Sequence, residues 1–146
     1  MYRRDYIQRM IEEVARSLSR AMGLRKDGLD EQALETVREA YHTFFSMEAE
    51  LVARLHPDDM LTFFTGQYEL KNEQKESLSH VLEAEGMLLA GKNPEESDDR
   101  LRKALVLLEH LDATDKATFS IDRRQRIENL REKLKNDPEF PADENQ

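Results

Sequence analysis

Apolar residues recur at three- and four-residue intervals along most of this 146-residue chain, and no stretch shows the sustained alternation of a half-buried β-strand. In the first segment, one side of a helical wheel gathers Ile7, Met10, Ile11, Val14, Leu18, Ala21 and Met22. The opposite side carries Arg9, Arg16 and Arg20. We therefore expect an all-α protein whose first helix covers about residues 4–22 or slightly more.

Turn and capping residues divide the middle of the chain. A second helix should begin near Asp30 and end between residues 45 and 55. A short third helix should start at Pro57, where acidic residues follow the proline, and stop at Gly66. A polar stretch over 67–75 should then lead into a fourth helix that ends at Gly91.

The clearest local signal is the run Asn93-Pro94-Glu95-Glu96. Asn can cap a helix, Pro suits its first position, and the second Glu can reach back to the cap. A fifth helix should therefore begin here and end near residue 112, and Ser120 should cap a sixth. These about six helices predict one domain over 1–136, followed by a disordered acidic tail over 137–146.

Composition closes several classes of function. The chain has no cysteine, which excludes disulfides, thiolate metal sites and thiol nucleophiles. Its net charge is −9, although residues 1–26 carry seven Lys and Arg against three Asp and Glu. An acidic body repels polyanions, and no apolar run approaches the length of a membrane span. We therefore expect a cytoplasmic protein with neither a nucleic acid nor a membrane as its partner.

Two of the expected helices share a pattern of small and large residues. Ala33-x3-Val37-x2-Ala40 and Ser97-x3-Leu101-x2-Ala104 each place small, large and small side chains on one face, just after a Gly-containing turn. Small residues let a neighbouring helix approach closely, as in the second helix of a tetratricopeptide hairpin. The copies lie 64 residues apart, there is no Trp, and no Pro closes either copy, so any such repeats are degenerate.

Longer segments carry a closer resemblance. The order DEQALETVREAY, ELVARLHPDDMLTFF and LEAEGMLLAGKNPEES resembles an uncharacterised bacterial family of tetratricopeptide-like helical proteins, over nearly the whole chain. The resemblance implies antiparallel helical hairpins stacked as degenerate tetratricopeptide-like repeats, and a bacterial cytoplasmic setting. It implies no activity and no catalytic motif.

Metal and catalytic chemistry find little support in the sequence. Glu39-x-x-His42 has the spacing that di-iron bundles use, but it occurs once and faces away from the apolar side of its helix. No nucleophile elbow, phosphate loop or zinc-binding spacing is present. We therefore expect no metal, no cofactor and no enzymatic activity.

Four residues are candidates for a partner-binding groove. Phe44-Phe45 and Phe63-Phe64 are adjacent pairs, and neighbours on a helix point about 100° apart, so one face cannot bury both rings of a pair. Phe45, Phe63 and Phe64 are therefore candidate groove residues. Glu85 joins them because it lies near the centre of an apolar face, where a carboxylate needs a cationic or hydroxyl partner. We expect Glu85 to be partly buried, with such a partner within hydrogen-bond reach.

These patterns predict a non-catalytic protein-interaction module, a scaffold or adaptor, that binds a protein or peptide. Two alternatives remain at this stage. In one, the surplus aromatic rings close a symmetric homodimer. In the other, a helical-bundle enzyme assembles its site from scattered carboxylates.

Overall fold

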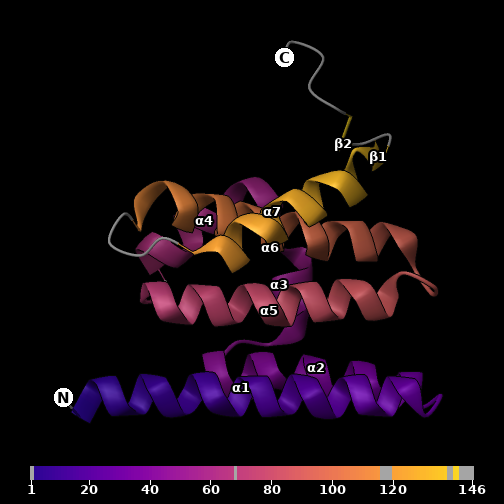
Figure 1. Ribbon diagram of the computed structural model, residues 1–146, viewed down its shortest axis with the longest axis horizontal. Helices are drawn as coiled ribbons and strands as arrows, with labels where there is room; N and C mark the ends of the chain where they lie inside the picture. Colours follow the sequence, from indigo (N-terminus) through magenta and orange to yellow (C-terminus); the bar gives the residue numbers. More distant parts are fainter. Residues whose placement is uncertain (1, 68, 116–119, 138–139, 142–146) are drawn as a thin grey trace.

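Two long helical hairpins form the body of the protein (Figure 1). The computed structural model describes residues 2–67, 69–115, 120–137 and 140–141. The first hairpin pairs α1 (Tyr2–Lys26) with α2 (Asp30–Phe45), and the second pairs α5 (Asn72–Leu89) with α6 (Pro94–Thr114). The all-α expectation is confirmed, whereas the kinship to tetratricopeptide repeats stays a prediction.

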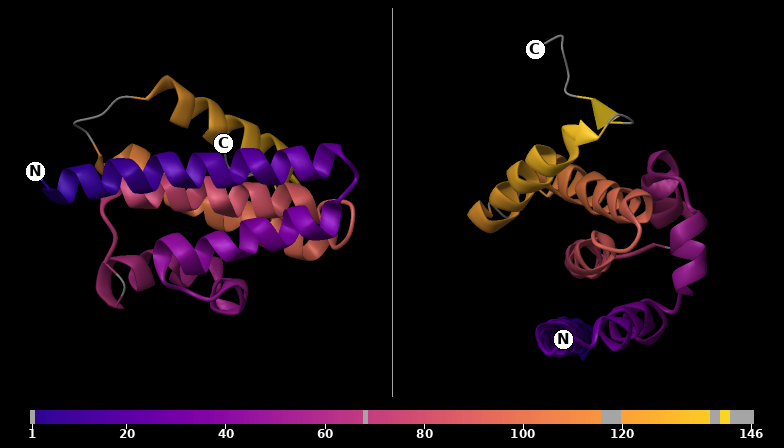
Figure 2. Two further views of the ribbon diagram at one scale, coloured as in Figure 1. Left: turned by 90° about the horizontal axis from the view of Figure 1, so that it is seen from below. Right: turned by 90° about the vertical axis from the view of Figure 1, so that its right-hand side faces the viewer.

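Helix α5 is the centre of the stack. It packs against both α1 and α2, and α7 (Ile121–Leu134) packs on α6. α1, α5 and α7 run in one direction, while α2 and α6 return in the other (Figure 1). The end-on view in Figure 2 shows α1 and α7 on either side of a space that α5 borders.

The chain between the hairpins differs from the expected short helix. It is divided into α3 (Ala49–Arg54), η1 (Pro57–Asp59), α4 (Met60–Thr62) and the π-helical η2 (Phe63–Gln67). The expected short helix from Pro57 to Gly66 is present as an unbroken helical run over 57–67, which changes from 3-10 through α to π geometry, whereas the separate α3 was not expected. This segment follows the surface of α6, and several short turns can follow a surface that one straight helix would leave.

Lys103 of α6 holds this segment against α6 through hydrogen bonds. Its side chain is fully buried, and Nζ donates to the carbonyl oxygens of Val52 at 2.7 Å and Ala53 at 3.2 Å, and to Asp99 at 2.6 Å. Burial lowers the pKa of Lys103, and the nearby carboxylate of Asp99 opposes that effect. The ammonium group thus binds carbonyls that no longer have a helical partner, as cations near a helix C-terminus do.

The capping signals are confirmed. Asn93 Oδ1 accepts a hydrogen bond from the backbone N–H of Glu96 at 3.2 Å, and Ser120 Oγ accepts one from that of Arg123 at 3.0 Å. α5 begins before the expected polar stretch ends, because Gln74 Oε1 accepts from the backbone N–H of Lys71 at 2.9 Å. Polar side chains here start the helix instead of delaying it.

The two helices of the second hairpin meet at small residues. Ser97 Oγ donates to the carbonyl of Gly86 at 2.6 Å. A Cβ added at Gly86 would lie 2.7 Å from Leu101 Cδ2, so this contact has no room for a larger side chain. The expected close approach at Ser97, Leu101 and Ala104 is therefore present.

The chain continues past α7 into a two-residue antiparallel pairing. β1 (Asn136–Asp137) pairs with β2 (Phe140–Pro141), with Asp137 opposite Phe140. The predicted disordered tail covers 137–146, and its residues 138–139 and 142–146 lie outside the described ranges.

Candidate functional site

Glu85 lies at the meeting point of three helices and is completely buried. Its Oε1 accepts hydrogen bonds from the Tyr41 hydroxyl at 2.6 Å and from Arg100 Nε at 3.0 Å, and its Oε2 accepts one from Arg38 Nε at 3.1 Å. The expected hydroxyl and cationic partners are thus confirmed. The expected partial burial is wrong, because α2 and α6 both cover this side of α5.

Charges in this cluster stabilise one another. Burial, and then the Glu85 carboxylate, raise the pKa of Tyr41 well above its ordinary value, so the hydroxyl stays a donor. Burial alone would lower the pKa of Arg100, but the carboxylates of Glu85 and Asp99 outweigh it and raise that pKa. Both Glu85 oxygens already accept donors from the protein, which favours a structural tie over a ligand anchor.

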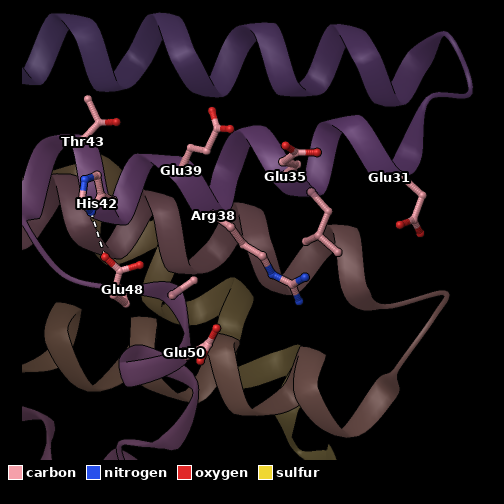
Figure 3. A pocket seen from close by; sticks show the side chains of 10 residues that line it. Glu31, Glu35, Arg38, Glu39, His42, Thr43, Glu48 and Glu50 are labelled. Carbon is pink, nitrogen blue, oxygen red and sulfur yellow. Dashed lines mark hydrogen bonds and ion pairs between the residues drawn. The ribbon is translucent and has the colours of Figure 1, made fainter.

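An acidic pocket of about 770 Å³ opens beside this cluster (Figure 3). It is lined by Glu31, Leu34, Glu35, Arg38, Glu39, His42, Thr43, Glu48, Ala49 and Glu50. Figure 3 shows His42 turned toward Glu48, and its Nδ1 lies 2.9 Å from Glu48 Oε1. The expected exposure of Glu39 and His42 is confirmed. Within the described ranges, no group of three or more Asp, Glu and His side chains is arranged to hold a metal ion.

The aromatic candidates belong to the core. Phe45 and Phe64 are buried, so they cannot line an open groove, and that part of the expectation is corrected. Phe63 is half-buried and packs edge-on against Phe64, with ring centroids 5.1 Å apart. Phe44 is also half-buried against the core. One ring of each pair is thus buried and the other is half-buried, as the 100° between neighbours on a helix requires.

The open apolar surface lies elsewhere, along α1. Ile11, Leu18 and Met22 are only half-buried, and Ala15 between them is exposed. They line a pocket of about 490 Å³ together with residues of α1 and α5, namely Val14, Ser19, Ser77 and His80. A second pocket of about 340 Å³ shares Ile11, Ser77 and His80 with the first, so the two form one groove. We call it the α1–α5 groove.

Acidic residues gather at one end of the α1–α5 groove. Besides the shared residues, the second pocket is lined by Asn72, Glu73, Glu76, Asp115 and Arg123. Among the residues that the structure describes, the lining of this end has three carboxylates and one guanidinium, and that guanidinium forms ion pairs with Glu76 and Asp115. The lining residues of α1 between Ile11 and Met22 carry no charge, so the groove has an apolar wall and an acidic end.

Two arginines of α7 attach that helix to α5 beside the groove. Arg123 Nη2 donates to Glu76 Oε1 at 2.6 Å, and Arg126 Nη2 donates to Glu83 Oε1 at 2.7 Å. Arg126 Nη1 also lies 3.2 Å from His80 Nε2. A guanidinium only donates, so Nε2 accepts and Nδ1 carries the proton of the neutral ring. Desolvation and Arg126 lower the pKa of His80, which favours that neutral form.

The sequence pattern places Ile11, Val14, Leu18 and Met22 on the apolar side of the first helix, without Ala15 and Ser19. The wheel places Met10, Val14 and Ala21 in one row and Ile11, Ala15, Leu18 and Met22 in a second row beside it. The first row is buried and the second is not. The 4-3-4 spacing of the second row shows that α1 has a second apolar row, but which row the helices α2 and α5 cover depends on the packed structure.

Within the described ranges, every helix is too short or too polar to cross a membrane. Comparison of the chain with models of protein families, with curated proteins and with solved structures finds no match.

Proposed function

We propose that this chain is a non-catalytic protein-interaction module, a scaffold or adaptor, that binds its partner in the α1–α5 groove. The observation that carries the proposal is the second apolar row of α1, which the described helices cover only in part. Open apolar rows with a polar rim are typical of interaction surfaces. The proposal includes a cytoplasmic setting and kinship to bacterial tetratricopeptide-like proteins.

The arrangement of ionisable groups supports a non-catalytic role. The most deeply buried carboxylate, Glu85, already accepts three hydrogen bonds from the protein. Catalytic acids and bases need access to a substrate, and Glu85 has none. The acidic pocket of Figure 3 is wide and exposed, which suits a solvated surface.

Site-specific photo-crosslinking tests the proposal. A photoreactive amino acid at Leu18, inside the groove, should form a discrete protein adduct in cells of the source organism. The same amino acid at Gln32, exposed on α2, is the matched control and should form none. Equal adducts from both positions, or none from Leu18, would contradict the proposal.

A further inference from the structure

The α1–α5 groove contains the kind of recess that receives side chains of another helix. In helix pairs, a side chain of one helix enters a hole formed by residues i, i+3, i+4 and i+7 of the other. Ile11, Val14, Ala15 and Leu18 form one such hole, and Ala15, Leu18, Ser19 and Met22 form the next. Together these are the α1 residues that line the apolar pocket.

The centre of this row is small, which allows a close approach. Ala15 is exposed and lies between the half-buried Ile11 and Leu18. A helix that crosses α1 here can bring its backbone near Ala15 while its own large side chains enter the two holes. An extended peptide has no matching three- and four-residue spacing with which to fill consecutive holes.

The groove is closed on one side, which selects the kind of helix that fits. α5 covers one flank of the open row, with Ser77 and His80 at the pocket. In an antiparallel two-fold pair of α1 helices in contact through this row, both copies of α5 would lie on the same side and approach each other. A single foreign helix carries no α5 of its own and avoids that clash.

The charge of the groove lining indicates which type of residue the bound helix should carry at one end. Among the described residues, the end of the groove near Ile11 is lined by Glu73, Glu76 and Asp115 and by Arg123. Arg123 forms ion pairs with Glu76 and Asp115, so the exposed Glu73 is the carboxylate available to a bound helix. A Lys or Arg on the bound helix would be stabilised at this end, and an acidic residue would be repelled.

We infer that the α1–α5 groove binds an amphipathic helix of another protein, with apolar residues at three- and four-residue spacing against α1 and a basic residue over Glu73. This inference rests on the proposed function and names its partner class. The apolar spacing of the partner helix is inferred from the two holes on α1, and its basic end is inferred from the acidic lining of the groove.

A peptide-display selection on the full chain tests the inference. Enriched peptides should share a three- and four-residue apolar spacing with Lys or Arg toward one end, and circular dichroism should show helix on binding. Ala15→Trp should lower their affinity about tenfold or more, because the indole fills both holes. Glu39→Trp, at an exposed position of α2, is the matched control and should bind like the wild type.

Charge reversal provides a second readout. Glu73→Lys should lower the affinity for peptides with a basic end severalfold at low salt and by less at high salt. The same substitution should raise the affinity for versions of these peptides with an acidic end. Glu73 is exposed, so the substitution leaves the fold intact. Equal binding of both peptide versions before and after the reversal would overturn the assignment of the basic end.

The remaining outcomes separate the inference from the proposed function. Enriched peptides without helical spacing, or peptide binding that survives Ala15→Trp, would show that the partner is not an amphipathic helix in this groove. Crosslinks from Leu18 would in that case still support the proposed interaction function. A dimer in light scattering that Ala15→Trp dissociates would replace the foreign helix by a second copy. No enriched peptide and no crosslink would remove both proposals.

Discussion

The two sides of α5 differ from the usual pattern of buried apolar and exposed polar residues, because a carboxylate is buried on one side and apolar residues are only half-covered on the other. Toward α2 and α6, α5 buries Glu85 completely. Toward α1, the groove leaves Ile11, Leu18 and Met22 only half-covered. The buried charge is tolerable because each of its oxygens accepts a hydrogen bond. The second apolar row of α1 stays half-covered because the two helices packed on α1, α2 and α5, bury the row of Met10, Val14 and Ala21 beside it. Burial therefore follows from available partners and not from residue type alone.

The largest expected effect is at the buried side. Glu85→Ala should lower the free energy of unfolding by about 3–5 kcal/mol, because Arg100 and the Tyr41 hydroxyl lose their acceptor in the interior. Urea denaturation followed by circular dichroism measures it. Glu39→Ala, at an exposed carboxylate of α2, is the control and should change the free energy little. A loss below about 1 kcal/mol at Glu85 would show that the cluster is dispensable.

The second prediction compares two alanines. Ala104 is completely buried between helices, so Ala104→Leu should destabilise the protein by about 1–3 kcal/mol. Ala15 is exposed in the groove, so Ala15→Leu should change stability by less than about 0.5 kcal/mol. Thermal unfolding of both variants checks the contrast. Similar losses at both positions would mean that the groove is as tightly packed as the core.

A smaller effect is expected at the start of α6. Asn93→Ala removes the acceptor for the Glu96 N–H and should cost about 1 kcal/mol. Gln32→Ala, on the exposed side of α2, is the control for loss of a polar side chain. Denaturant midpoints would reveal the difference, and equal midpoints would show that solvent replaces the cap without cost.

The smallest prediction concerns pH and His110. Burial, and then the Lys75 ammonium 3.5 Å from its Nε2, lower the pKa of His110 in the folded protein. The unfolded chain therefore binds a proton first as pH falls, so stability should decrease below the ordinary histidine pKa of about 6.5 and stay unaffected above it. His110→Gln should reduce that decrease between neutral and mildly acidic pH. Parallel stability curves for the two proteins would contradict the assignment.

Features that depend on neighbours in sequence were predictable. The caps at Asn93 and Ser120 are formed within one turn, so residue type and spacing determine them. The need of Glu85 for partners followed from its place on an apolar face. Its partners Arg38, Tyr41 and Arg100 lie 47, 44 and 15 residues away along the chain, so only the packed structure identifies them.

Features that depend on which helices are neighbours were missed. A helical wheel gives α1 one broad apolar side, and only the positions of α2 and α5 show that Val14 is covered and Leu18 is open. The burial of Phe45 and Phe64 was missed for the same reason. The division of residues 49–67 into short turns follows the surface of α6, which no local pattern of that segment describes.

The attachment of α3 by Lys103 has a consequence for the order of folding. Each long hairpin is closed by a short turn, whereas the bond from Lys103 to Val52 joins residues 51 apart in the chain. Closing a long loop costs more entropy than closing a short one, so the hairpins should form first and residues 49–67 should dock last. Amides of this segment should then exchange hydrogen through local opening, while those of α5 and α6 exchange only through global unfolding.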